Sequence, residues 1–269
     1  VHRGLWEAEL HAGGFTGDPF FDAELQVVYT RPDGSETAAD GYYKGGGRWG
    51  IRAYCDQPGE WTWRCASGIA SLNGAAGGFV VTSSDLPGKL RIHRADARQF
   101  AYDSGEWFLH IGDTGYRYAT DTEPLWRDYI DEAAAAGFTK IRVWFCRGRS
   151  DVAALFTESR DGLNPPYWDE IDRRLLYALE RHPHLQIQLI PFGEDGEELL
   201  RYGRGDRTSR MMARYAQARF SALPNVQWCI VNDIGMRDRN SELAKAVDAI
   251  GHDMAAREPW GTLLTTHQK

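Results

Sequence analysis

The sequence has few cysteines, few basic residues relative to acidic ones, and no long apolar run. Its four cysteines in 269 residues include no CxxC pair, so neither a disulfide scaffold nor a zinc site is expected. Lys and Arg number 31 against 38 Asp and Glu, and the formal net charge of -7 argues against a nucleic-acid partner. No apolar stretch approaches the roughly 20 residues of a membrane-spanning helix. We therefore expect no membrane partner, no metal and no cofactor, whereas homo-oligomer formation stays open.

The cysteine positions bear on the redox environment. Cys55 and Cys65 flank the Pro58-Gly59 turn, where a tight hairpin would place them out of register, so we expect free thiols. Free thiols do not decide in which cellular compartment the protein works, but they favour the cytoplasm over secretion. The sequence also holds 10 Trp, 12 Tyr and 11 Phe, residues that stack on sugar faces but also fill large cores.

Residues 1–85 contain short alternating apolar segments with no helical period. Turn signals separate these segments, among them Pro32-Asp33-Gly34, Gly45-Gly46-Gly47 and Asn73-Gly74. The pattern predicts an immunoglobulin-like β-sandwich domain over residues 1–85. The expected strands are Trp6–His11, Glu24–Thr30, Trp49–Tyr54, Trp61–Cys65 and Gly78–Thr82.

Residues 86–269 alternate strand-like runs with amphipathic segments, which predicts a parallel sheet covered by helices. The expected strands are Trp107–Gly112, Lys140–Cys146, Leu185–Pro191, Val226–Val231 and Thr262–Thr266; the expected helices are Glu123–Ala136, Tyr167–Arg181, Ser209–Ala222 and Ser241–Arg257. A dinucleotide-binding fold would require GxGxxG after the first strand, and Gly112-Asp113-Thr114-Gly115 lacks the third glycine. We therefore expect a (β/α)8 TIM-type barrel, of which about the first five βα units lie in this sequence.

Three segments resemble a known family. Residues 58–64 (PGEWTWR) and 72–81 are similar to the β-sandwich that often precedes bacterial apiosidase-like glycoside hydrolases. Residues 100–114, which end in Gly-Asp-Thr, resemble the opening of the catalytic barrel of those enzymes. Residues 164–172 and 228–233 resemble their later strands. The resemblance implies a retaining glycosidase that uses two carboxylates and acts on a carbohydrate.

The strongest catalytic candidate is Asp233, which follows an apolar strand directly after Asn232. Many barrel glycosidases end this strand in Asn-Glu, whereas the apiosidase-like enzymes resemble this sequence in placing Asp there. The resemblance implies that Asp233 is the acid/base and that Asn232 holds a sugar hydroxyl. The nucleophile is then expected beyond residue 269. The alternative interpretation of Asp233 is a cap of the next helix.

Other side chains near predicted strand ends are candidates for substrate binding, each with a structural alternative. Asp113 could bind substrate or tie down a turn. Arg142 lies in an apolar strand and requires a carboxylate partner, either to orient a catalytic acid or to close the barrel. Trp144 is a sugar platform or core filler, and His267 is a hydroxyl partner or a structural histidine. Glu194 belongs to an acidic run that is usually a solvated loop.

Two rival functions stay open. A carbohydrate-binding protein on the same fold needs no second carboxylate, and fold alone does not decide function. A sugar lyase or isomerase would need a base with a metal or a Tyr/His pair, for which Tyr116 and His267 are the candidates. The residues favour the glycoside hydrolase.

Overall fold

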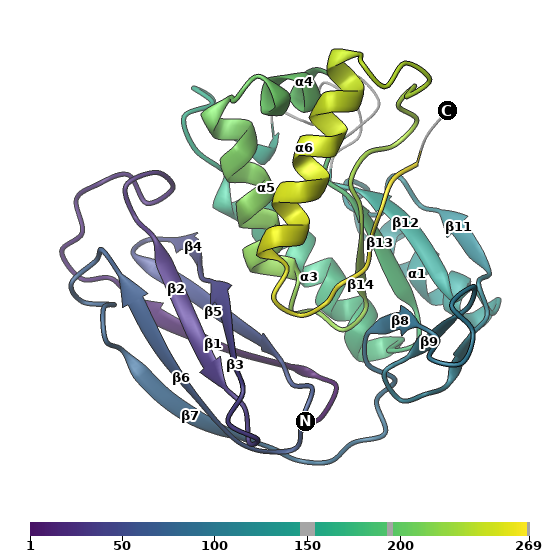
Figure 1. Cartoon of the computed structure of the whole chain (residues 1–269), viewed down its shortest axis with the longest axis horizontal. Helices are drawn as coiled ribbons and strands as arrows, with labels where there is room; N and C mark the ends of the chain where they lie inside the picture. Colours follow the sequence, from purple (N-terminus) through teal and green to yellow (C-terminus); the bar gives the residue numbers. More distant parts are fainter. Residues whose placement is uncertain (146–153, 193–195, 268–269) are drawn as a thin grey trace.

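The computed structural model describes residues 1–145, 154–192 and 196–267. Antiparallel strands build its first part, and parallel strands alternating with helices build its second part (Figure 1). This confirms the predicted order of a β-rich region followed by an α/β region. Among the helices described, none is both long enough and apolar enough to cross a membrane.

Two antiparallel sheets form the N-terminal region. Their strands are β1 (Leu5–His11), β2 (Leu25–Thr30), β3 (Glu36–Asp40), β4 (Tyr42–Gly45), β5 (Arg48–Tyr54), β6 (Gly59–Ser67) and β7 (Ala76–Val81). The strand orders are β1-β5-β4 and β3-β2-β6-β7. Side chains from both sheets, including Val27, Ile51 and Trp61, share one buried cluster. The sequence did not predict β3 and β4, because their Ala, Gly and Lys residues have low strand propensity.

The segment around Pro58-Gly59 is not a hairpin. The chain passes there from β5 in one sheet to β6 in the other, so Cys55 and Cys65 lie in different layers. Both are buried free thiols, which confirms that prediction, although the hairpin argument for it is wrong. Burial raises the pKa of Cys55 to about 12 and that of Cys65 to about 11.

A small antiparallel sheet connects the two regions. It contains β8 (Leu90–Ile92), β9 (Phe100–Tyr102) and β10 (Trp107–Phe108). The predicted strand over Trp107–Gly112 is therefore wrong, because its first residues pair with β9. The parallel sheet begins only at β11 (Gly112–Thr114), after an exposed connection that includes Leu109.

Five parallel strands follow one another in sequence order across the second sheet. They are β11, β12 (Lys140–Trp144), β13 (Gln186–Ile190), β14 (Val226–Cys229) and β15 (Leu264–Thr265). The described helices are α1 (Leu125–Ala135), α3 (Pro165–Arg181), α4 (Glu197–Gly203), α5 (Arg207–Phe220) and α6 (Glu242–Arg257). Helix α4 lies in the region predicted as a solvated acidic loop.

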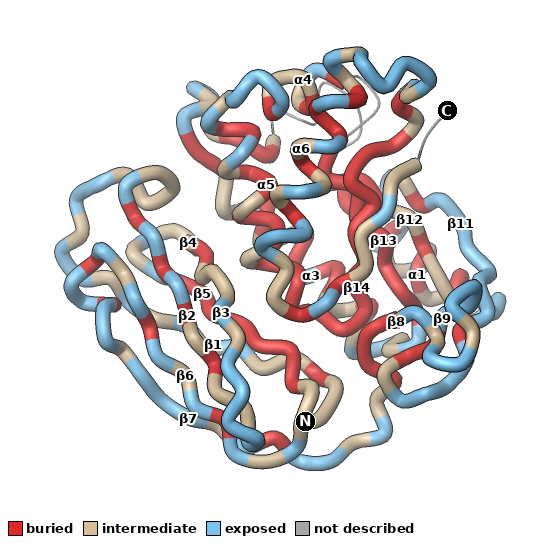
Figure 2. The backbone as a smooth tube through the Cα atoms, viewed as in Figure 1, coloured by how far each residue is buried: buried red, intermediate tan, exposed pale blue. Residues whose placement is uncertain are grey.

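The described helices cover one face of this sheet. Ile141 and Val143 of β12 point into the main core with Ile130 of α1, Leu175 of α3 and Ile250 of α6. Figure 2 shows the buried residues concentrated in these strands and in the helix sides that face them. A doubly wound sheet has helices on both faces and a reversal of strand order. Neither feature occurs among the described helices and strands, which argues against a doubly wound sheet.

A buried ionic network joins the two regions. Arg52 of β5 donates from both Nη atoms to the two carboxylate oxygens of Asp172 in α3, each at 2.8 Å. Arg219 of α5 donates to Asp172 Oδ2 at 3.1 Å, and Arg52 also pairs with Glu7 of β1. Although burial alone would raise the pKa of Asp172, the two guanidinium groups hold it below its usual value.

Candidate functional site

The candidate site lies on the face of the parallel sheet opposite the helices. Because side chains alternate along a strand, Lys140, Arg142 and Trp144 point away from the core that holds Ile141 and Val143. The strand register places Arg142 beside Thr114 of β11 and Gln188 of β13. A cavity of about 300 Å³ opens on this face, which is the size of a small-molecule site. Its lining comprises His110, Gly112, Asp113, Thr114, Lys140, Arg142 and Gln188.

An aromatic pair lies next to this cavity. Tyr116 and Trp144 are stacked with ring centroids 4.2 Å apart and an interplanar angle of 21°. Trp144 is buried against Ile190 and Cys229, while Tyr116 is half-buried. The core-filling interpretation of Trp144 therefore has direct support, and Tyr116 is the ring of the pair with more exposed surface.

Three polar side chains meet where β14 and β15 end. His267 Nδ1 is 3.0 Å from Asn232 Oδ1 and 2.9 Å from Asp233 Oδ1. Asn232 is fully buried, and its Nδ2 approaches the Tyr116 hydroxyl at 3.4 Å. Polar contacts and ring stacking thus connect Asp233 to Trp144 through His267, Asn232 and Tyr116. We call Tyr116, Trp144, Asn232, Asp233 and His267 the strand-end cluster.

Asp233 does not cap the following helix. The N-cap of α6 is Ser241, whose hydroxyl accepts a hydrogen bond from the Ala244 N–H at 3.2 Å. Asp233 instead has a left-handed backbone with φ of 54°, a conformation that Asp tolerates better than most residues. The capping alternative is therefore wrong.

The described part of the structure does not supply the carboxylate partner that the sequence argument required for Arg142. Among these residues, no carboxylate lies within salt-bridge distance of its guanidinium group. Arg142 donates to Thr114 Oγ1 at 3.3 Å, and its guanidinium carbon is 5.9 Å from the centre of the Tyr116 ring. The physical reason is partial exposure, since a cation in contact with solvent does not need a buried counter-ion.

Asp113 is not brought together with the strand-end cluster. Its register partner is Ile141, whose side chain points toward the helices. The Asp113 carboxylate accepts a hydrogen bond from the Tyr129 hydroxyl of α1 at 2.9 Å. Glu194 lies outside the described residues.

Burial lowers the pKa values of two groups that line the cavity on the open face, Lys140 and His110. Burial, with a smaller contribution from the charge of Arg142, lowers the pKa of Lys140. Burial and the nearby Lys140 also lower the pKa of His110, which favours the neutral imidazole. Neither residue was a candidate in the sequence, although Lys140 lies two positions before Arg142 on the same face of β12. In the described ranges, no group of three or more His, Cys, Asp or Glu residues could hold a metal ion.

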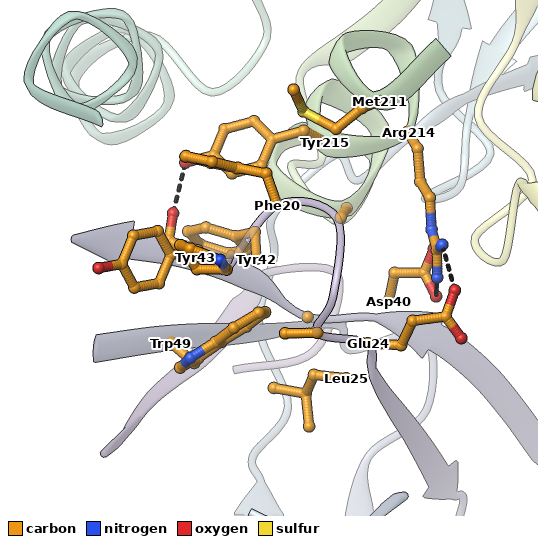
Figure 3. Close-up of a pocket in the computed structure, with 14 residues that line it drawn as sticks. Phe20, Glu24, Leu25, Asp40, Tyr42, Tyr43, Trp49, Met211, Arg214 and Tyr215 are labelled. Carbon is orange, nitrogen blue, oxygen red and sulfur yellow. Dashed lines mark hydrogen bonds and ion pairs between the residues drawn. The ribbon is translucent and has the colours of Figure 1, made fainter. Parts of the chain in front are cut away.

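A second cavity lies between the N-terminal sheets and α5 (Figure 3). Its volume of about 50 Å³ holds only a few water molecules and is far below the usual size of a ligand site. Arg214 forms ion pairs with Asp40 and Glu24 on one side, and the Tyr215 hydroxyl donates to the Tyr43 carbonyl on the other. This cavity is part of the packing between the two regions.

Comparison with known proteins agrees with this architecture. Residues 4–68 match the family described as Domain of unknown function (DUF5060), and residues 94–269 match the family described as Apiosidase-like, catalytic domain. No curated protein sequence matches the chain.

Among solved structures, a candidate glycoside hydrolase from Bacteroides vulgatus ATCC 8482 matches with a TM-score of 0.84 and 19% identity. That match covers 100% of this chain and 55% of the other, so this chain spans about half the length of its structural relative. A glycoside hydrolase family 5 protein from the same organism matches with a TM-score of 0.51 and 18% identity, over 70% of this chain and 41% of the other. At these identities the likeness concerns the fold.

The apiosidase-like match extends over more than half of the residues and includes the whole parallel sheet together with the strand-end cluster. The chain belongs to the family of apiosidase-like catalytic domains.

Proposed function

We propose that the protein is a glycosidase and that Asp233 is its acid/base. The observation that carries the proposal is the position of Asp233 at the end of β14, where its carboxylate contacts His267 beside the buried Asn232. Reactive groups of barrel enzymes lie at this end of the strands. The family membership and the glycoside hydrolase folds of the structural relatives support the same reaction class.

The proposed reaction follows the two-carboxylate retaining route. Asp233 in its acid form protonates the leaving-group oxygen while a second carboxylate attacks the anomeric carbon. In the second step Asp233 removes a proton from water, which releases the sugar and restores the acid. We propose that the second carboxylate belongs to a part of the protein beyond residue 269.

We also propose that the five parallel strands are the first part of a (β/α)8 barrel. Sequential strand order, helices over one face and a polar opposite face support this arrangement. The N-terminal sheets, over residues 1–85, would then form an immunoglobulin-like sandwich next to a catalytic domain over residues 86–269. The Tyr116 and Trp144 pair would lie beside the bound sugar, with the more exposed Tyr116 ring toward it.

One observation favours carbohydrate binding without hydrolysis as a second candidate. Within the described part of the strand-end cluster, Asp233 is the one carboxylate, and glycoside hydrolysis by this route needs two.

Activity assays on the full-length protein distinguish these functions. A panel of nitrophenyl glycosides and of plant and bacterial polysaccharides is incubated with the wild-type protein and with Asp233→Asn. We expect release of nitrophenol or reducing ends by the wild type from at least one substrate. Retention on a polysaccharide with no bond cleavage by either protein would identify a binding protein instead.

A further inference from the structure

His267 makes contacts that a substrate-binding histidine would not need. Its Nδ1 lies between two oxygen atoms, Asn232 Oδ1 at 3.0 Å and Asp233 Oδ1 at 2.9 Å. Its own backbone N–H donates to the Val231 carbonyl at 3.1 Å. His267, two residues after the end of β15, is therefore held through both its backbone and the Nδ1 edge of its ring.

These contacts determine the tautomer of His267. The proposed acid holds its proton on Oδ2, the oxygen that faces the leaving group, so Asp233 Oδ1 only accepts hydrogen bonds both before and after that proton is transferred. Nδ1 must therefore carry a proton to interact with Oδ1. A protonated Nδ1 can in turn meet only the carbonyl oxygen of the Asn232 amide, and this directs the Asn232 NH₂ group toward the Tyr116 hydroxyl. One proton on His267 therefore orients two neighbouring side chains.

The same proton also decides which carboxylate oxygen of Asp233 is available to protonate the leaving group. Oδ1 is occupied by His267, and among the described residues Oδ2 has no hydrogen-bond partner. The left-handed backbone of Asp233 follows directly after Asn232, and it lets both side chains reach one imidazole ring.

We propose that His267 is a positioning residue, which holds Asn232 and Asp233 through its Nδ1–H so that Asp233 Oδ2 faces the leaving group. This inference rests on the proposed glycosidase function. It differs from the sequence interpretation, in which His267 contacts a sugar hydroxyl directly.

Two amide substitutions separate these roles in the full-length protein, because they place a donor at different ring positions. His267→Asn puts its side-chain NH₂ near the position of Nδ1, and His267→Gln puts it near that of Nε2. We expect His267→Ala to lower kcat by roughly 10²-fold with little change in KM, the size expected for a misplaced catalytic group. His267→Asn should recover at least about tenfold of that loss, whereas His267→Gln should not. His252→Asn, at an exposed position on α6, is the control and should match the wild type.

Recovery by the Gln variant alone would show that Nε2 contacts substrate and would overturn the proposal. Wild-type kcat in the Ala variant, or equal losses in the Ala and Asn variants, would overturn it as well.

A second measurement does not depend on activity. The ring nitrogen shifts of His267 in a ¹⁵N NMR spectrum of the full-length protein report which nitrogen carries the proton at neutral pH. A proton on Nδ1 supports the proposal, and a proton on Nε2 alone overturns it. If the wild type cleaves no glycoside, the proposed function fails, and the NMR result still decides whether Nδ1 is the donor to Asp233.

Discussion

We call the buried contact between the N-terminal sheets and the α/β region, with Arg52, Asp172 and Arg219 at its centre, the seam. Both the seam and the open face of the parallel sheet place arginines beside aromatic rings. In the seam these arginines pair with a carboxylate, whereas on the described part of the open face Arg142 does not. In the seam, the side chains of Arg52 and Arg219 are 2% and 1% exposed and share Asp172 as their partner. On the open face, Arg142 is half-buried and has a hydroxyl as its nearest polar partner among the described residues.

This difference separates structural charges from functional ones. A fully buried guanidinium group without a counter-ion costs several kcal/mol, and both arginines of the seam pair with Asp172. A half-buried cation next to a cavity of about 300 Å³ can remain unpaired and meet a substrate or another part of the protein. The comparison predicts that changes in the seam affect stability, whereas changes on the open face affect activity.

The largest effect is expected from breaking the seam at its shared acid. Asp172→Ala leaves two buried guanidinium groups without their common partner, so it should lower the free energy of unfolding by about 3–5 kcal/mol. Denaturant unfolding measures this change. Glu7→Gln is the matched control, since it removes a half-exposed partner of the same Arg52 and should cost less than about 1 kcal/mol. Similar losses in both variants would contradict the distinction between the buried and exposed partners.

The lowered pKa of Asp172 also predicts that the free energy of unfolding decreases at acid pH. The pKa of Asp172 is lowered in the folded state, so its contribution is present above the unfolded value of about 4 and is lost as pH falls through the lower folded value. Asp172→Asn should flatten this part of the stability curve.

The next effect concerns activity on the open face. Asp233→Asn should keep the fold and lower turnover of natural substrates by roughly 10²-fold or more, the size expected for lost general acid catalysis. The loss should be smaller for activated aryl glycosides, whose leaving groups need little protonation. Azide should then restore part of the turnover, because this anion attacks the anomeric carbon of the glycosyl-enzyme intermediate without the base assistance that water needs, and it displaces the second carboxylate to give a glycosyl azide. Wild-type rates on both substrate types would exclude Asp233 as the acid.

A buried lysine in the seam gives a smaller, pH-dependent effect. Lys89 Nζ contacts the carbonyls of Ser221 and Leu223 and the hydroxyl of Thr262, and burial lowers its pKa to about 7. Above pH 7 the unfolded chain binds the extra proton, so stability should rise by about 2 kcal/mol between pH 7 and 9 relative to Lys89→Met. Unfolding curves at several pH values measure this slope. Parallel curves would mean that the three acceptors keep the ammonium group charged.

The smallest effect is expected at Tyr116. Tyr116→Phe keeps the ring stacked on Trp144 and removes only a long contact with Asn232, so turnover should change by about twofold. Tyr116→Ala removes the stacked face as well and should raise KM by about tenfold. Steady-state kinetics on one substrate compare the two, and equal effects would assign the role to the hydroxyl.

Local patterns in the sequence were sufficient to predict most of the described strands and helices. Alternating apolar residues predicted five of the seven N-terminal strands, and helical periodicity predicted α1, α3, α5 and α6 within a few residues of their observed ends. The sequence did not predict β8 and β9, and it merged β10 and the start of β11 into one strand, because two or three residues are too few to show a period. For the same reason the orientation of Asp113 could not be predicted, since a shift of one position reverses the face of a strand.

The sequence by itself determined the order of the regions, the family resemblance and the candidate Asp233 beside Asn232, because all three depend on neighbouring residues. Only the tertiary structure decided which charges are paired and which groups meet. Arg52 and Asp172 are 120 positions apart, and His267 reaches Asp233 only because β15 pairs with β14. Such contacts depend on strand pairing and packing between distant segments, and no local pattern in a single sequence encodes them.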